Sequence, residues 1–190
     1  MNDEIKDGIL KLAEPLARAE GLEVWGLDVT PGPTARVRLF IDAPLEDFDA
    51  GEGGQGRLSA TIDQCERISR ALGLALEVED LFPGPWNLEV SSPGLERKFY
   101  SAAQARPYVG DVIEAALWEP LAERGSRKVY KGKLLAAGDD FIELEPCSIG
   151  EDGRVLPENI PPVRIPFKSV RNARRVHIFA APKKPRKGKA

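Results

Sequence analysis

The residues best suited to chemistry in this sequence are cations that could hold phosphate groups. Lys131 and Lys133 alternate along a segment with the pattern of a strand, so both side chains should lie on one face of a sheet. Clusters of lysine and arginine bind phosphate without reading base sequence. For any single cation a solvated surface charge is the simpler interpretation. Three further candidates cluster near the last predicted strand: Arg171, Arg174 and Arg175.

No comparable set of catalytic groups can be found. His177 is the only histidine, which excludes a site with several histidine ligands and leaves no triad. Cys65 falls on the apolar face of a predicted helix, where cysteine behaves as a small hydrophobe, and Cys147 has no base near it in sequence. A hydrolase would need a pocket that gathers His177 with several carboxylates. We therefore predict a binding protein with no catalytic residues, no cofactor and no metal.

Charge is divided unevenly along the 190 residues. Residues 1–98 carry 10 lysines and arginines against 19 aspartates and glutamates, whereas residues 99–190 carry 17 against 11. Such an asymmetry suggests a basic partner for the acidic half and an anionic partner such as nucleic acid for the basic half. Two halves that are each simply soluble would also fit this composition, so charge alone leaves both interpretations open.

The elements that must position these residues begin with a helix and a hairpin. Apolar residues at helical spacing predict a helix over 4–20, which Pro15 should kink or shorten. Apolar residues then alternate with other residues over 22–30 and 35–41, with proline and glycine between the two segments. This pattern is typical of two strands joined as a hairpin.

A second helix and a third strand complete the first half. Thr61 and Gln64 match a capping box, in which side chains satisfy free N–H groups at a helix start. Leu88 and Val90 should face inward from a strand over 86–91. The order α-β-β-α-β predicts a small sheet with helices on one face, a domain of the α+β class. The acidic, glycine-rich segment 42–56 is predicted to be a mobile loop.

The second half has a different sequence pattern, with short apolar segments between turns and no run of apolar residues at helical spacing. Several short strands at brief intervals predict a small all-β barrel. Segment 146–162 is a long polar insertion, and the five cations near the carboxyl terminus predict a disordered basic tail over 181–190. The predicted strands are 112–118, 129–136, 141–145, 163–166 and 173–178.

A rigid junction is predicted between the two halves. Pro93 fixes φ at the second position of a type II turn, and Gly94 supplies the positive φ that the third position requires. Such a turn would restrict the angle between two domains that grip one partner, although any two domains need some junction. The predicted organisation is an acidic α+β domain over 1–92, a junction over 93–98, a basic β-barrel domain over 99–180, and the tail over 181–190. The junction residues singled out are Ser91, Ser92, Pro93, Gly94, Leu95 and Arg97.

Several segments, in this order and spacing, resemble the RimP family of ribosome maturation factors. The segment LEVSSPGLER, residues 88–97, is similar to the family's interdomain junction. It follows TIDQCERISRAL and VEDLFPGPWN, and it precedes YVGDVIEAAL, YKGKLLAAGDDFIELE and VRIPFKSVRNARRV. The resemblance covers most of residues 5–178. Loops 42–56 and 146–162 are longer than in the family pattern, Lys98 stands where a proline is usual, and the basic tail is an extension.

The resemblance implies a cytoplasmic factor that binds immature small ribosomal subunits and aids their late folding near the decoding region. It implies rRNA and a basic small-subunit ribosomal protein as partners, a carboxyl-terminal barrel similar to SH3-like and Sm-like barrels, and no catalysis. The alternative is a general Sm-like RNA-binding protein that acts outside ribosome assembly. The candidate contacts to rRNA or to a ribosomal protein are Arg36, Arg38, Lys131, Lys133, Arg171, Arg174 and Arg175.

The remaining sequence features bear on location and assembly. The first twenty residues contain acids and no continuous apolar block, so they predict neither a signal peptide nor a transmembrane helix. Two cysteines far apart predict no disulfide framework. We therefore expect a monomer in the cytoplasm, with no membrane partner.

Overall fold

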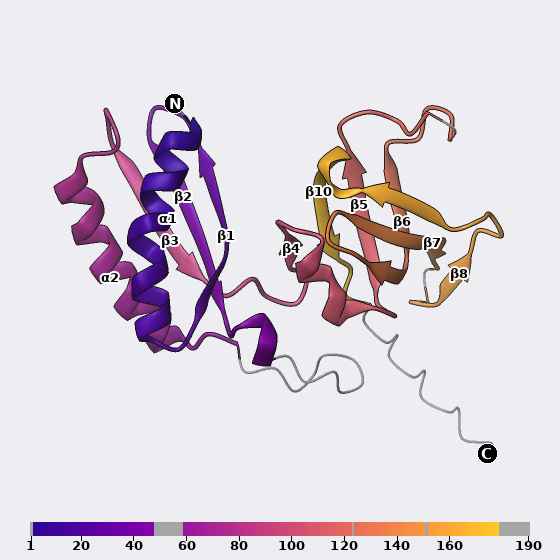
Figure 1. The fold of residues 1–190 in the computed structure, drawn as a ribbon, viewed down its shortest axis with the longest axis horizontal. Coiled ribbons are helices and arrows are strands. Elements are labelled where there is room, and N and C mark those ends of the chain that lie inside the picture. Colours follow the sequence, from indigo (N-terminus) through magenta and orange to yellow (C-terminus); the bar gives the residue numbers. More distant parts are fainter. Residues whose placement is uncertain (1, 48–58, 123, 151, 179–190) are drawn as a thin grey trace, which may run out of the picture. The chain divides into compact units, whose positions relative to one another are not determined.

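The computed structural model divides the chain into two compact units, Met1–Tyr100 and Ser101–Ala190. It describes residues 2–47, 59–122, 124–150 and 152–178, so the predicted tail and most of loop 42–56 lie outside the described residues. The predicted succession of an α+β half and a β-rich half is confirmed (Figure 1). In the described part of the chain, no helix combines the length and the apolar character needed to cross a membrane.

The first unit follows the predicted order α-β-β-α-β. Its sheet has the order β1-β2-β3, with β1 antiparallel to β2 and β2 parallel to β3. A parallel pair needs a long crossover connection, and α2 provides it between β2 and β3. The elements are α1 (Asn2–Ala19), β1 (Glu23–Thr30), β2 (Ala35–Asp42), a short 3-10 helix (Leu45–Asp47), α2 (Ile62–Glu79), β3 (Trp86–Ser91) and the two-residue strand β4 (Lys98–Phe99), which was not predicted.

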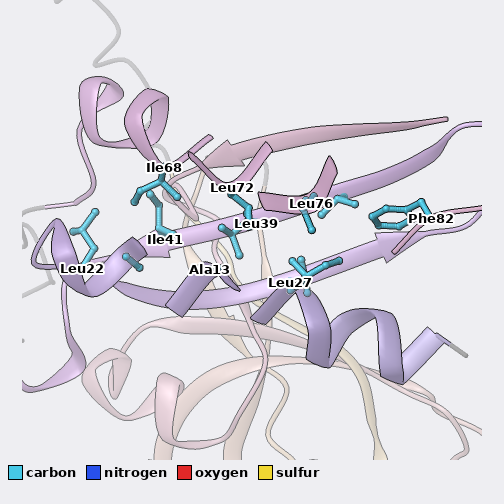
Figure 2. Packing of buried hydrophobic residues seen from close by; sticks show 12 residues of the cluster. Ala13, Leu22, Leu27, Leu39, Ile41, Ile68, Leu72, Leu76 and Phe82 are labelled. Atoms are coloured by element: carbon cyan, nitrogen blue, oxygen red, sulfur yellow. The ribbon is translucent and has the colours of Figure 1, made fainter. Parts of the chain in front are cut away.

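The core of the first unit lies between the helices and one face of the sheet (Figure 2). Alternate residues of β2 are buried because successive side chains of a strand point to opposite faces. In α1 the fully buried positions include two alanines, which allow a close approach of the backbone. Leu88 and Val90 pack against this core, as predicted. Helices α1 and α2 and strand β2 supply most of the fully buried residues. These are Ile9, Ala13 and Ala17 of α1, Val37, Leu39 and Ile41 of β2, and Ile68, Leu72 and Leu76 of α2.

Helix α1 runs through Pro15 without ending, so the prediction that this proline might shorten the helix is wrong. Proline removes the backbone hydrogen bond to the carbonyl four residues earlier, which here belongs to Lys11. Lys11 and Pro15 both lie on the exposed side of the helix, where water can hydrate that carbonyl. The apolar face opposite is packed, and its burial outweighs the loss of one hydrogen bond.

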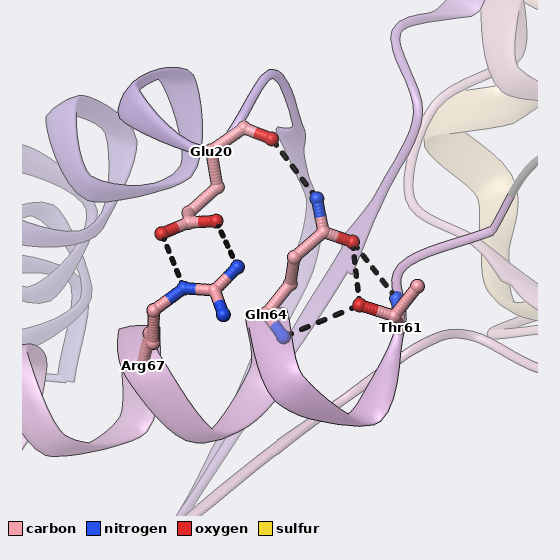
Figure 3. A network of polar contacts seen from close by, with 4 residues as sticks. All are labelled: Glu20, Thr61, Gln64 and Arg67. Atoms are coloured by element: carbon pink, nitrogen blue, oxygen red, sulfur yellow. Dashed lines mark hydrogen bonds and ion pairs between the residues drawn. The ribbon is translucent and has the colours of Figure 1, made fainter.

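The predicted capping box at the start of α2 is confirmed (Figure 3). The Gln64 backbone N–H donates to Thr61 Oγ1, the Thr61 backbone N–H donates to Gln64 Oε1, and Gln64 Nε2 donates to the carbonyl of Glu20. Arg67 adds a bidentate ion pair with Glu20, at 2.6 and 2.8 Å. The Arg67 guanidinium holds the pKa of Glu20 below its ordinary value. The end of α1 is thereby tied to the first turn of α2.

The second unit is a curved sheet with the strand order β10-β5-β6-β7-β8, and β9 also pairs with β7 (Figure 1). Its strands are antiparallel neighbours. No pairing among the described strands of this unit closes the sheet into the expected barrel. The strands are β5 (Val112–Leu117), β6 (Val129–Ala137), β7 (Phe141–Ile149), β8 (Val155–Pro157), β9 (Val163–Pro166) and β10 (Val170–Arg175).

Three predicted strands of the second half match observed ones within about one residue, and two differ. Strand β7 continues to Ile149, into the predicted polar insertion, instead of ending at residue 145. Strand β10 begins three residues before the predicted 173–178, because β5 pairs with residues from Val170 onward. Strand β8 lies inside the predicted polar insertion 146–162, and a 3-10 helix over Ala103–Tyr108 was not predicted at all. Both missed elements are short and carry no clear periodicity. The core of this unit is built from alternate strand residues, among them Ile113, Ala115, Leu117, Tyr130, Leu134, Ile142, Leu144 and Ile165.

Candidate functional site

The predicted junction residues divide into an exposed part and a buried part. Ser91 ends β3, and Ser92 and Pro93 are half-buried. Gly94 has the predicted positive φ, at +71°, but the turn of this segment is centred on Leu95 and Glu96 and not on Pro93 and Gly94. Leu95 is exposed, whereas Arg97 is buried. The turn therefore ends on a buried arginine.

Arg97 forms a buried ion pair with the last residue of β2. Its Nη1 lies 2.8 Å from Asp42 Oδ2, and the Asp42 side chain has no exposed surface. The other Asp42 oxygen accepts the backbone N–H of Ala43, and Arg97 Nε donates to the carbonyl of Gly94. Hydrogen bonds on both partners are what a buried ion pair needs to compensate the loss of water. The pair fixes segment 94–97 to the end of β2.

The next three residues continue this attachment along β1. Trp25 Nε1 donates to the carbonyl of Lys98 at 2.7 Å, and the Trp25 ring packs against Phe99. The register between β1 and β2 shifts between Val24 and Gly26, so Trp25 occupies a β-bulge. The bulge turns this indole toward segment 97–99. Trp25 is fully buried even though it does not belong to the core between helices and sheet.

Tyr100 lies directly over Gly26. A Cβ atom at Gly26 would come within 2.1 Å of the Tyr100 ring, so any larger residue would meet it. Lys98 Nζ contacts Asp28 Oδ1 at 2.6 Å and lies 4.5 Å from the centre of the Tyr100 ring. Burial, together with the nearby Asp28 carboxylate, raises the pKa of Tyr100, so the phenol stays protonated. Residues 97–100 thus form one continuous attachment to β1 and β2, which we call the 97–100 seat.

Arg36 and Arg38 lie on the exposed face of the same sheet. Both approach one carboxylate of β3, with Arg38 Nε 2.9 Å from Glu89 Oε2 and Arg36 Nε 3.6 Å from Glu89 Oε1. Asp28 stands opposite Arg38 on the other side. Asp28 is already paired with Lys98, so Arg36 and Arg38 share Glu89 as their ion-pair partner. Glu89 neutralises part of their charge, and both arginines can still offer N–H donors to solvent.

Lys131 and Arg174, in the second unit, converge on a third residue that was not predicted. Glu114 of β5 stands between them, 3.2 Å from Lys131 Nζ and 3.0 Å from Arg174 Nη2. The register pairs Glu114 with both residues across adjacent strands. Burial acts to raise the pKa of Glu114, but the hydrogen bonds from Arg174 and Lys131 outweigh it and hold that pKa below its ordinary value. The carboxylate therefore stays charged and neutralises part of this face.

The other three predicted cations have separate environments. Arg175 is half-buried, with Nε 2.8 Å from Asp111 Oδ2 and its guanidinium 5.3 Å from the centre of the Tyr108 ring. Lys133 and Arg171 are exposed, and no carboxylate of the described residues lies within ion-pair distance of either one. Lys133 and Arg171 are thus the two of the seven candidates best placed to meet a phosphate.

Neither reactive thiols nor a metal site emerge from the described part of the chain. Burial raises the pKa of the thiols of Cys65 and Cys147, so neither is held as a thiolate. No group of three or more histidine, cysteine, aspartate or glutamate side chains there is arranged to hold a metal ion. A groove of about 310 Å³ in the first unit lies between α1 and β1 and is lined by Lys6, Leu10, Glu14, Val24, Trp25, Gly26, Leu27 and Tyr100.

Three residues of this attachment were not predicted, two in the strands β1 and β2 and one in the 97–100 seat itself. Asp42 was placed at the start of a loop, Lys98 was noted only as a departure from a family pattern, and Gly26 was not singled out. A signal was present for two of them. Asp42 directly follows the alternating apolar residues of β2, and Gly26 interrupts an apolar strand, which often marks a bulge or a close backbone approach.

Comparison with known proteins extends the similarity over the whole chain. The RimP N-terminal domain family matches residues 12–96. The ribosome maturation factor RimP of Desulfovibrio desulfuricans is 38% identical over 98% of this chain and 85% of its own length. That of Nitratidesulfovibrio vulgaris is 42% identical over 94% of this chain and 95% of its own length. The ribosome maturation factor RimP of Lawsonia intracellularis is 37% identical over 93% of this chain and 89% of its own length.

Proposed function

Because the chain belongs to the RimP family of ribosome maturation factors, we propose that it binds immature small ribosomal subunits in the cytoplasm and is required for their late assembly. It acts by binding alone, without catalysis or a cofactor. The observation that carries the proposal is the identity with curated ribosome maturation factors across both units. Its partners would be rRNA and a basic small-subunit ribosomal protein near the decoding region.

The charges of the chain support two kinds of contact. The acidic first half is complementary to a basic ribosomal protein, and the exposed Lys133 and Arg171 of the second unit are suited to rRNA phosphates. Electrostatic attraction of this kind speeds encounter and sets orientation more than it fixes affinity. Binding would therefore be transient and sensitive to salt, as suits a factor that leaves the mature subunit.

Sedimentation of cell extracts tests this function. We expect the full chain to sediment with free small subunits and their precursors, and to be absent from translating ribosomes. Depletion of the protein should cause small-subunit precursors to accumulate, and restoration should clear them. An equal distribution of the protein over all ribosomal fractions, with no precursors on depletion, would contradict the proposal.

A general Sm-like RNA-binding protein is the second candidate, favoured by the exposed cations Lys133 and Arg171. It differs from the first in specificity. Under that alternative the full chain would bind unrelated RNAs as tightly as small-subunit precursors at equal salt. Under the proposed function, competition by unrelated RNA at equal phosphate concentration should leave most of the protein on the precursors.

Deletion of residues 181–190 should weaken the salt dependence of RNA binding. These residues carry five cations and no acid. Each phosphate contact releases counterions, so five contacts would contribute up to about three or four units to the slope of log K against log salt concentration. Filter binding of the full chain and the truncated chain at several salt concentrations measures this slope. An unchanged slope would remove the tail from RNA binding.

A further inference from the structure

Trp118 is a large apolar side chain that the second unit leaves in solvent. It directly follows β5 and is 62% exposed, whereas Trp25 is only 1% exposed. Exposure of a single apolar residue needs no explanation, but an indole is costly to leave in water and is well shaped for stacking. Whether Trp118 is placed to bind a ligand therefore depends on the residues around it.

The half-buried and exposed residues beside Trp118 form a patch on the three neighbouring strands β10, β5 and β6. Asn172, Ala116 and Val129 stand in one row across β10, β5 and β6. Trp118 lies two residues beyond Ala116 and thus on the same face, and its backbone N–H donates to the carbonyl of Ser169 at 3.1 Å. Val129, which is 48% exposed, extends the apolar surface beside it. The backbone of Trp118 is thus held by the residue that precedes β10.

Three exposed cations lie next to residues of this patch in the sequence, namely Lys128, Lys168 and Arg171. Lys128 Nζ donates to the carbonyl of Trp118 at 3.1 Å and keeps two further N–H donors for another partner. Arg171 sits in the bulge where the register of β10 shifts, between Val170 and Asn172, and Lys168 precedes Ser169. Among the described residues none of these three cations lies within ion-pair distance of a carboxylate.

Two acids on the strands and loops near the patch are neutralised among the described residues. Glu114 is shared by Lys131 and Arg174, and Glu158 is held by Arg127, which keeps the pKa of that carboxyl low. Glu119, the residue after Trp118, is exposed and opposes an anionic ligand. A protein-docking surface would be expected to offer a wider apolar area than one indole and one valine. An indole among unneutralised cations instead matches the way single-stranded nucleic acid is held.

We propose that Trp118 stacks against an unpaired base of single-stranded RNA, while Lys128 and Arg171 contact the flanking phosphates. The inference rests on the proposed function, which makes rRNA a partner, and it names the residues and the class of RNA. Recognition would be tolerant of sequence, because every base presents a π-face. Base-paired RNA would bind less well because its bases are already stacked on their neighbours.

Binding of a short oligouridine to the full chain tests the stacking residue. Trp118→Ala should weaken binding by about 5- to 100-fold, and Trp118→Phe should recover much of the loss because phenylalanine also stacks. The matched control is Leu156→Ala, which removes another exposed apolar side chain of the same unit and should leave affinity unchanged. Glu119→Gln should tighten binding.

Tryptophan fluorescence gives a second readout that a purely structural role would not alter. Oligouridine should quench the emission of the wild-type chain, and Trp118→Phe should abolish this quenching while Trp25 and Trp86 remain. A blunt-ended RNA duplex with the same number of phosphates should quench weakly, because all of its bases are paired. Equal binding by Trp118→Ala, or equal quenching by the duplex, would overturn the inference.

The same variants separate this inference from the proposed function. If Trp118→Ala retains both oligouridine affinity and sedimentation with small-subunit precursors, the stacking role fails and the proposed function stands. If the wild-type chain does not sediment with precursors but binds oligouridine in a Trp118-dependent way, the proposed function fails and the stacking role stands. Quenching by a basic peptide in place of RNA would identify a protein-docking residue and reject the stacking role.

Discussion

Replacing Arg97 by methionine is expected to lower the free energy of unfolding of the first unit by about 3 to 5 kcal/mol. The substitution keeps an unbranched apolar stem but removes the guanidinium that compensates the fully buried charge of Asp42, 2.8 Å away. Removal of one partner of a buried ion pair leaves the other charge in a poorly solvating environment, which is why the effect far exceeds that of a surface pair.

Urea unfolding followed by tryptophan emission would measure this loss, since the Arg97 guanidinium lies 5.2 Å from the centre of the Trp25 ring. Arg38→Met is the matched control. It removes an arginine of the same unit from an exposed pair with Glu89, and it should cost about 1 kcal/mol or less. The double variant Asp42→Leu/Arg97→Met should recover much of the stability, because apolar replacement of both charges removes the desolvation cost. A loss in Arg97→Met no larger than in the control would show that the buried pair contributes little.

The buried pair also clarifies which parts of the fold could be predicted from the sequence. Periodicity located both long helices and all strands of the first sheet, because apolar residues recur at 3.6 or 2 positions wherever one face is buried. The capping box at Thr61 and the positive φ of Gly94 were also predicted, since each depends on residues next to one another in the chain. These are local rules.

The parts that could not be predicted depend on contacts between distant residues. Asp42 and Arg97 are 55 positions apart, and neither the burial of one nor the charge of the other indicates that they meet. The convergence of Lys131 and Arg174 on Glu114 likewise needs the strand order β10-β5-β6, which no spacing in the sequence specifies. The predicted positive face was therefore less positive than the count of its cations suggested.

The 97–100 seat shows that the junction motif also attaches the chain to β1 and β2, which residues close together in the sequence do not indicate. Gly94 has the positive φ that was predicted, and the residues after it hold the chain against β1 and β2. Lys98 takes part in this attachment through Asp28 and through its own carbonyl. The side chains that hold the seat come from two strands, Trp25 and Asp28 from β1 and Asp42 from β2. The attachment can therefore be tested by substitutions in the strands or in the seat itself.

Gly26→Ala should lower the free energy of unfolding of the first unit by about 1 to 3 kcal/mol. The new methyl group would lie 2.1 Å from the Tyr100 ring, so the ring must leave its position over β1. Displacement of Tyr100 would also disturb its contact with Lys98 and the tilted packing of its ring against Phe40. The cost arises from steric overlap and not from backbone conformation, because Gly26 is not among the residues with positive φ.

A double-mutant cycle in urea separates this clash from other effects of the added methyl group. Once Tyr100→Ala has removed the ring, Gly26→Ala should cost much less than it does in the wild-type chain, with a coupling energy of about 0.5 to 3 kcal/mol. Gly73→Ala is the matched control, since its methyl group would meet nothing within 4 Å and alanine favours the helix in which Gly73 lies. Additive losses in the cycle, or a Gly26→Ala variant as stable as the Gly73→Ala control, would mean that Tyr100 is not held against β1. The seat would then rest on the contacts of Arg97, Trp25 and Lys98.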